Sequence, residues 1–186
     1  FRSPMQAILS FSLRLRPRTK AGAANNPAPA AAELAAVAAK VAALLPGRVV
    51  ASATLAEPGA LAAALAQLGP EGVVFPMFMA GGWFTRVHLP GQLVKAGAVD
   101  WRVLEPFGCL EAVQDLAVQL VLESGAEEAI IAAHGSFKSP VPAAIAGRVA
   151  AAVAARGLRV GCGFIDQEPR LAGLTGFGVQ AVCLPF

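Results

Sequence analysis

Two short motifs in the last third of the chain contain the side chains best suited to chemistry. The tripeptide His134–Ser136 (His-Gly-Ser) follows the apolar run 129–133, and the tetrapeptide Asp166–Pro169 (Asp-Gln-Glu-Pro) follows the run 158–164. An imidazole can coordinate a divalent metal or accept a proton near neutral pH, and a nearby carboxylate can assist in proton transfer. A histidine at a strand end can equally be structural, and Glu168 could simply stabilise the first turn of a following helix. The motifs therefore predict a site for metal coordination or proton transfer, with a structural role as the alternative.

The elements that must position these motifs follow from the alternation along the chain. Short β-branched runs alternate with longer Ala- and Leu-rich segments, as in βα units around a parallel sheet. We expect strands at residues 6–11, 48–53, 72–77, 101–104, 129–133, 158–164 and 179–184, and helices at 30–45, 58–67, 90–95, 110–122, 141–155 and 169–174. Ligands of open parallel sheets bind beyond the carboxyl ends of the strands. Both polar motifs fall at such ends.

An internal repeat organises the chain. Arg48-Val49, Glu57-Pro58 and Pro76 recur as Arg159-Val160, Glu168-Pro169 and Pro185, and the spacing from Arg to Glu is 9 in both copies (57 − 48 and 168 − 159). Self-similarity over a domain-sized period indicates duplication. We therefore expect two domains, a first repeat over 1–126 and a second over 127–186 that is truncated at its C-terminus. Ser12 and Leu55 take the places of His134 and Asp166 in the first repeat, so the polar pair belongs to the second repeat alone.

A glycine- and aromatic-rich stretch, Phe78–Pro90, follows the third predicted strand. Gly81 and Gly82 permit close approach of the backbone to a flat ligand or to the other domain. Trp83, together with the neighbouring Phe84, could stack on a planar ring system or fill the interface between the domains. His88 is expected to cap the helix that starts near Pro90, with metal binding as the alternative.

Composition argues against several other classes of function. The chain is 56% hydrophobic and 15% charged, but its longest apolar stretches are Ala-rich and interrupted by charges, so we expect no membrane span. The basic cluster between residues 14 and 20 lacks interleaved aromatic residues, which favours a solvated loop or anion contact over nucleic-acid binding. No G-x-G-x-x-G or Walker motif supports an organic nucleotide cofactor, and no nucleophile elbow surrounds Ser136. The three cysteines form no C-x-x-C pair, which indicates a reducing cytoplasm.

The ordered set of motifs resembles a known family. The His-Gly-Ser tripeptide, the stretch Phe164–Pro169 and the strand Val182–Phe186 are similar to elements of the class II tetrapyrrole chelatases of the CbiX type, the sirohydrochlorin cobalto- and ferrochelatases of siroheme and cobalamin biosynthesis. The resemblance implies two flavodoxin-like (chelatase-like) α/β domains, each with a mainly parallel sheet and helices on both faces, that enclose a macrocycle. It also implies a monomer with a pseudo-twofold internal repeat, which binds a tetrapyrrole and neither nucleic acid nor membrane.

The same resemblance assigns roles to individual residues. His134 corresponds to a metal-binding histidine that also accepts pyrrole protons, and Asp166 corresponds best to the acidic position. The substrate-binding residues implied are Gly135, Ser136, Glu168, Gly81, Gly82 and Trp83. The first repeat has Ser12, Phe84 and His88 where the family has its two histidines and an aspartate, and the second repeat stops before its Gly-x-His, so we expect the first repeat to bind no metal.

The function implied is insertion of a divalent metal, Co²⁺ or Fe²⁺, into a sirohydrochlorin-type tetrapyrrole, with the metal as substrate and no organic cofactor. Imidazole and carboxylate ligands suit several divalent metals and do not distinguish cobalt from iron. The alternatives are a non-catalytic tetrapyrrole- or metal-binding protein of the same fold, and an interaction protein without a ligand.

Overall fold

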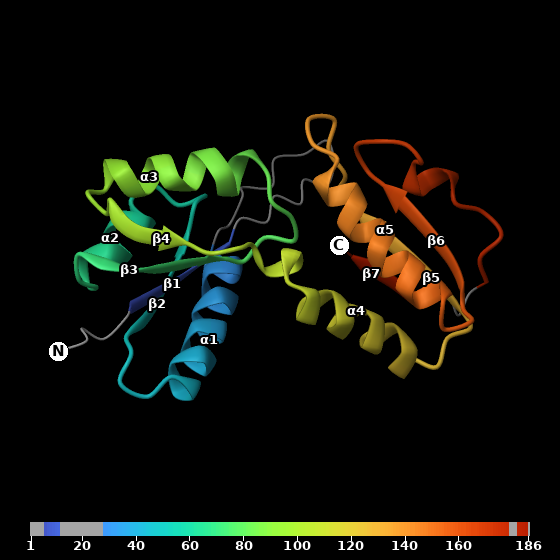
Figure 1. The fold of residues 1–186 in the computed structure, drawn as a ribbon, viewed down its shortest axis with the longest axis horizontal. Helices are drawn as coiled ribbons and strands as arrows, with labels where there is room; N and C mark the ends of the chain where they lie inside the picture. The colour runs from blue at the N-terminus through green and yellow to red at the C-terminus, as the bar shows by residue number, and fades with distance from the viewer. Residues whose placement is uncertain (1–5, 12–27, 179–181, 186) are drawn as a thin grey trace. The chain divides into compact units, whose positions relative to one another are not determined.

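The structure, a computed structural model, describes residues 6–11, 28–178 and 182–185. Contacts divide the chain into two compact units, the first formed by residues 1–78 and 83–105 and the second by residues 79–82 and 106–186. Each unit contains a parallel sheet and α-helices (Figure 1). The expected α/β class with parallel sheets is therefore confirmed. Within the described residues, no helix is both long and apolar enough to cross a membrane.

The first unit is built on four parallel strands in the order β2-β1-β3-β4. Its strands are β1 (Gln6–Phe11), β2 (Val50–Thr54), β3 (Glu71–Pro76) and β4 (Asp100–Val103), and its helices are α1 (Ala28–Leu44), α2 (Ala60–Ala66) and α3 (Leu89–Lys95). Val74 of β3 is fully buried in a cluster with residues of α2 and α3. Phe75, the next residue, packs instead with Leu34 and Ala38 of α1. Because successive side chains of a strand point to opposite faces, α1 covers one face and α2 and α3 cover the other.

Two helix boundaries in the first unit differ from the expected ones for local reasons. Helix α2 begins at Ala60 rather than residue 58, because Gly59 has a left-handed φ of 81° that excludes it from the helix. Helix α3 is preceded by a π-helical turn, η1 (Phe84–His88), which runs directly into it. The expected cap at His88 is wrong, because His88 has helical φ and ψ and its side chain makes no capping hydrogen bond.

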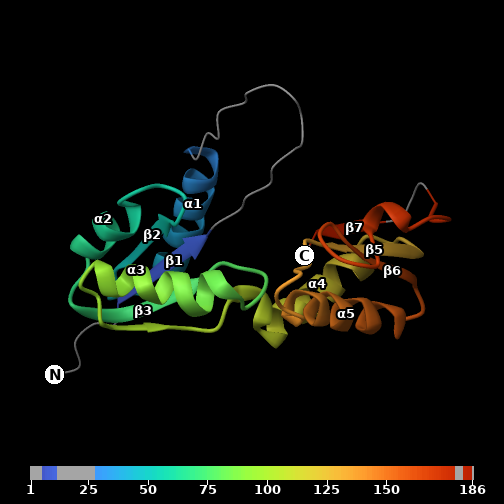
Figure 2. The same ribbon diagram turned by 90° about the horizontal axis from the view of Figure 1, so that it is seen from above.

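The second unit contains three parallel strands in the order β6-β5-β7. They are β5 (Glu128–Ala133), β6 (Arg159–Phe164) and β7 (Val182–Pro185), and the helices are α4 (Glu111–Glu123) and α5 (Val141–Ala154). Val121 of α4, Ile131 of β5 and Val149 of α5 meet in one buried cluster, so both helices lie on the same face of the sheet (Figure 2). Helix α4 thus packs with the second unit, although the repeat assigned residues 110–122 to the first.

The opposite face of β6 is covered by the segment that follows it. A Cβ on Gly161 would lie 2.6 Å from Cζ of Phe177, and a Cβ on Gly163 would lie 2.9 Å from Cδ1 of Leu174. The two glycines therefore make room for side chains of this segment. The helix expected at 169–174 is only a 3₁₀ turn, η3 (Leu171–Gly173), since Gly173 and Gly176 interrupt the helical pattern. The resemblance implied helices on both faces of each sheet, but in the described part of the second unit (residues 79–82, 106–178 and 182–185) α4 and α5 lie on one face and the segment after β6 covers the other.

The two sheets share a strand arrangement and part of a register. The first strand of each sheet lies between the second and third, and Pro76 pairs with Ser10 as Pro185 pairs with Ala132. Ala7 lies three residues before Ser10, and Ala129 lies three residues before Ala132. The pairing of the first strand with the third is therefore the same in both sheets when the two repeats are aligned on these alanines and prolines. The second strands are displaced, because Ala7 pairs with Val50 whereas Ala129 pairs with Val160. By this register the counterpart of Asp166 is Ala56, one residue after the Leu55 chosen from the sequence.

Candidate functional site

The central strand of the second sheet places His134 at the carboxyl edge. His134 directly follows Ala133, the last residue of β5, and the adjacent parallel strand β6 ends at Phe164. Backbone hydrogen bonds continue beyond both strands: Ile165 N–H donates to Ala133 O at 3.1 Å, and Asp166 N–H donates to His134 O at 2.9 Å. The register of two neighbouring strands therefore brings together two residues that are 32 positions apart in the sequence (166 − 134).

The side chains of these two residues are in contact. Nδ1 of His134 lies 3.3 Å from Oδ2 of Asp166, and the two side chains are 64% and 47% exposed. A carboxylate at Nδ1 favours the tautomer with the proton on that nitrogen, which leaves the lone pair of Nε2 free to bind a metal or accept a proton. Because both groups are open to solvent, a ligand can reach them. The pair is therefore compatible with metal binding and with proton transfer at Nε2.

A tight turn follows His134. Gly135 has a left-handed φ of 74°, and a Cβ at this position would lie 2.7 Å from Cγ of Gln167. The backbone N–H of Ser136 donates to Oε1 of Gln167 at 2.8 Å. The Ser136 hydroxyl accepts a hydrogen bond from Lys138 N–H at 3.1 Å, so it stabilises the same loop. Glycine is therefore required at 135 by both backbone conformation and space.

The loop after β6 is held by Arg170. Its Nε donates to Glu168 Oε1 at 3.2 Å, its backbone N–H donates to Glu168 Oε2 at 2.9 Å, and a terminal nitrogen donates to Ile165 O. Its guanidinium lies 5.8 Å from the ring centroid of Phe137, which is 76% exposed beyond β5. Glu168 thus has a local structural partner, whereas its expected contact with substrate stays a prediction. Neither the role of Gln167 nor that of Arg170 was visible in the sequence, because both depend on how two distant loops meet.

The remaining candidate residues lie in the stretch after β3. Gly81 and Gly82 belong to the segment 79–82, which groups with the second unit, while Trp83 groups with the first. A Cβ on Gly82 would have no atom of the described residues within 4 Å. Lack of space for a side chain is therefore not the reason for a glycine at this position. Trp83 and Phe84 are 59% and 46% exposed and pack against one another with ring centroids 5.1 Å apart. Both rings keep exposed surface besides the contacts that they make with each other and with His88, and their contact with a substrate stays a prediction.

Ser12, the expected counterpart of His134, lies outside the described residues. Among the side chains that the structure describes, no three His, Cys, Asp or Glu residues gather in a way that could hold a metal ion. The candidate metal site therefore rests on His134 with Asp166 beside it, as a two-residue group.

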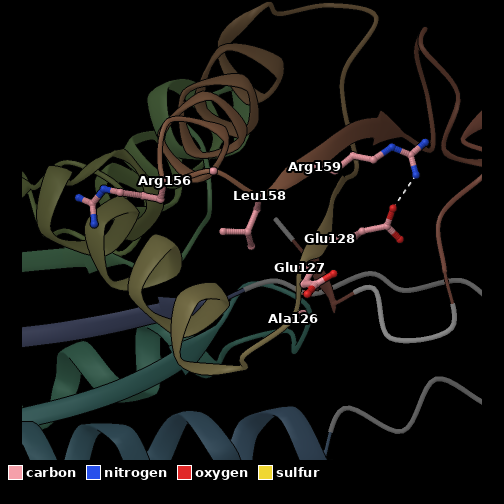
Figure 3. A pocket seen from close by; sticks show the side chains of 7 residues that line it. Ala126, Glu127, Glu128, Arg156, Leu158 and Arg159 are labelled. Atoms are coloured by element: carbon pink, nitrogen blue, oxygen red, sulfur yellow. Dashed lines mark hydrogen bonds and ion pairs between the residues drawn. The ribbon is translucent and has the colours of Figure 1, made fainter.

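A separate hollow lies at the other end of the second sheet (Figure 3). It is lined by residues near the amino ends of β5 and β6, namely Ala126, Glu127, Glu128, Arg156, Gly157, Leu158 and Arg159. Arg159 donates to Glu128 at 2.6 Å in its wall, as the dashed line in Figure 3 shows. Because His134 follows the carboxyl end of β5, this hollow is not part of the candidate site.

The fold and the site together define an α/β protein with an imidazole–carboxylate pair at the carboxyl edge of a parallel sheet. A solved structure of CbiX, described as the terminal enzyme for biosynthesis of siroheme in denitrifying bacteria, is similar with a TM-score of 0.80 and 34% sequence identity. The similarity covers 98% of this chain and 78% of that one. The chain belongs to the CbiX-type chelatase family, so the family expected from the sequence is confirmed.

Two further solved structures share the fold. SirB from Bacillus subtilis with Fe³⁺ has a TM-score of 0.67 at 18% identity, with 98% of this chain and 76% of that chain covered. The sirohydrochlorin chelatase SirB from Bacillus subtilis subspecies spizizenii in complex with cobalt has a TM-score of 0.65 at 15% identity, with 97% and 74% covered. No family model matches the sequence, and no curated protein matches it.

Proposed function

We propose that this chain inserts a divalent metal, Co²⁺ or Fe²⁺, into a sirohydrochlorin-type tetrapyrrole. Membership of the CbiX-type family supports the reaction class, since the similar solved proteins are a siroheme-biosynthesis enzyme and a sirohydrochlorin chelatase. The observation that carries the proposal within this chain is the 3.3 Å contact between His134 Nδ1 and Asp166 Oδ2. Cobalt and iron are both compatible with an imidazole ligand.

The reaction requires two changes at the macrocycle. One M²⁺ ion forms bonds to the four pyrrole nitrogens, and two N–H bonds break with release of two protons, so charge is conserved. His134 binds the incoming metal through Nε2 or takes up a pyrrole proton at that atom, and Asp166 stabilises the imidazolium that then forms. The exposed position of both side chains lets the protons pass on to solvent.

The organisation of the chain fits a duplicated chelatase. We propose that the first repeat, 1–126, is a degenerate copy that contacts the macrocycle through Gly81, Gly82 and Trp83, and that the second repeat, 127–186, supplies the metal site with Gly135, Ser136 and Glu168 as substrate contacts. The matching positions of Pro76 and Pro185 in their sheets support this duplication. Because both halves lie in one polypeptide, we propose that the protein is a monomer. We also propose that it works in the cytoplasm and uses no organic cofactor.

The alternative is a non-catalytic tetrapyrrole- or metal-binding protein of the same fold. One experiment distinguishes the chelatase from the non-catalytic binding protein. The purified chain is mixed with sirohydrochlorin and Co²⁺, and the absorbance change that accompanies metal insertion is followed. We expect wild type to accelerate insertion over the uncatalysed rate, and His134→Ala to abolish this acceleration with a melting temperature close to that of wild type. Binding of the tetrapyrrole by wild type without any acceleration would favour the non-catalytic protein.

Asp166→Asn is the second variant of this experiment, with Asp115→Asn on the exposed surface of α4 as its matched control. The amide keeps the shape of Asp166 but cannot stabilise an imidazolium by charge, so the insertion rate should fall by about ten- to a hundredfold. Asp115→Asn should insert metal at the wild-type rate.

A further inference from the structure

The half-buried side chain of Gln167 links the two loops that hold His134 and Asp166. It follows Asp166 directly, and its Oε1 accepts the backbone hydrogen bond of Ser136 at 2.8 Å. In the other direction, Asp166 N–H donates to His134 O at 2.9 Å. Each loop therefore donates one hydrogen bond to the other. These two hydrogen bonds are made by successive peptide groups, one by the carbonyl of the His134–Gly135 peptide and the other by the N–H of the Gly135–Ser136 peptide.

The missing side chain of Gly135 provides the space for this link. A Cβ at Gly135 would lie 2.7 Å from Cγ and 3.0 Å from Oε1 of Gln167, so the amide side chain occupies the place that any other residue would fill. The left-handed φ of Gly135 turns the chain so that Ser136 N–H faces this amide. Gly135 and Gln167 are therefore matched to one another in conformation, space and hydrogen bonding.

We propose that Gln167 is a positioning residue for the His134–Asp166 pair. Its amide accepts from the Ser136 N–H and the Asp166 N–H donates to the His134 carbonyl, both on the carboxyl side of His134, while the Ile165 N–H donates to the Ala133 carbonyl on the amino side. The backbone of His134 is therefore held on both sides, so the imidazole is presented to the carboxylate in one orientation. The catalytic consequence rests on the function proposed above, whereas the positioning itself does not.

The chemistry of the amide suits this place. Gln167 supplies a hydrogen-bond acceptor without adding a negative charge beside Asp166. A neutral acceptor therefore orients His134 without adding a second carboxylate beside it. Among the ion pairs of the described residues, Asp166 is the carboxylate that contacts His134.

Three variants separate hydrogen bonding from packing. Gln167→Met keeps a side chain of similar length against Gly135 but removes the acceptor, and Gln167→Glu keeps an acceptor at the same position. Gln119→Met is the matched control, because Gln119 makes a hydrogen bond to Glu123 on the exposed surface of α4. If Gln167→Met does not fold, Gln167→Ala replaces it, since alanine leaves the space beside Gly135 empty.

The first readout is the NMR spectrum of the imidazole rings, which does not depend on chelatase activity. The chain has two histidines, so His88 is an internal reference for His134. We expect Gln167→Met to shift and broaden the ring signals of His134 and leave those of His88 in place. Gln167→Glu should keep sharp His134 signals, and Gln119→Met should match wild type at both rings. Unchanged His134 signals in Gln167→Met would overturn the proposal.

The second readout is the kinetics of metal insertion. Gln167→Met should lower kcat about tenfold with KM for the tetrapyrrole nearly unchanged, and Gln167→Glu should recover most of the rate. Equal losses in both variants, together with equally lowered melting temperatures, would mean that Gln167 only stabilises the fold. If wild type itself inserts no metal, the proposed function fails while the ring spectra still decide whether Gln167 positions His134.

Discussion

The indole of Trp83 lies stacked on the imidazole of His88, with 4.9 Å between ring centroids and 27° between the ring planes. Phe84 approaches the same imidazole edge-on at 5.7 Å. His88 thus contacts aromatic rings in the first unit, whereas His134 contacts a carboxylate in the second. The two histidines of the chain differ in their neighbours, and the first-unit histidine is part of an aromatic cluster.

We expect Co²⁺ to bind at His134 and not at His88. An imidazole beside a carboxylate is the better site for a divalent cation, because the negative charge favours the ion and orients the ring. Crystals soaked in Co²⁺ should show anomalous density within coordination distance of His134. Density beside His88 and none beside His134 would reverse the roles that we assign to the two halves.

Replacement of Trp83 by alanine should weaken tetrapyrrole binding about tenfold, with only a small loss of stability from its ring contacts with Phe84 and His88. The indole is 59% exposed, so its removal opens no cavity, but it removes a flat apolar surface suited to a macrocycle face. Binding is measured by titration of the tetrapyrrole absorbance in the absence of metal. Val94→Ala, which removes a 61% exposed apolar side chain from α3, serves as the control and should bind as wild type does. Equal affinity in Trp83→Ala would exclude a substrate contact at this residue.

Gly135→Ala should destabilise the second unit and lower activity. The left-handed φ of 74° costs an alanine about 1 kcal/mol, and the added Cβ would lie 2.7 Å from Gln167 Cγ. Urea denaturation measures the loss in the free energy of unfolding. Gly147→Ala is the matched control: Gly147 lies inside α5 with nothing within 4 Å of an added Cβ, so this change should stabilise by about 0.5–1 kcal/mol. A Gly135→Ala protein as stable as wild type would contradict the tight packing at this turn.

Glu128 should make the stability of the second unit depend on acid pH. The Gly178 N–H, and then Arg159, hold the pKa of the Glu128 carboxyl below its ordinary value of 4.5. Since the folded pKa is the lower one, the stabilisation is full above the unfolded pKa and is lost as pH falls through the folded pKa. Thermal melts from pH 7 to pH 3 should therefore show Glu128→Gln less stable than wild type near neutrality, with the difference vanishing at the acid end. A constant difference across this range would mean that the carboxylate charge is not involved.

The order of the elements and the end of the sheet at which chemistry is expected could both be predicted from the amino-acid sequence. Hydrophobic periodicity is local, so most strand bounds were predicted within one or two residues, β5 at 128–133 against 129–133 for example. The rule that ligands bind at the carboxyl ends of parallel strands then placed His134 and Asp166 at one edge. Their contact at 3.3 Å agrees with that expectation, and their function in metal insertion stays a prediction.

Tertiary structure alone decided the details that depend on distant segments. The pairing of β5 with β6 sets which residue of one loop faces which residue of the other, and a shift of one position would exchange Asp166 with a neighbour. The fit of Gln167 into the space at Gly135, the Arg170 contacts and the packing of α4 with α5 depend on such long-range contacts. A local pattern does not identify these partners, because the free energy that selects them comes from contacts between side chains that are far apart in the sequence and meet only in the folded protein.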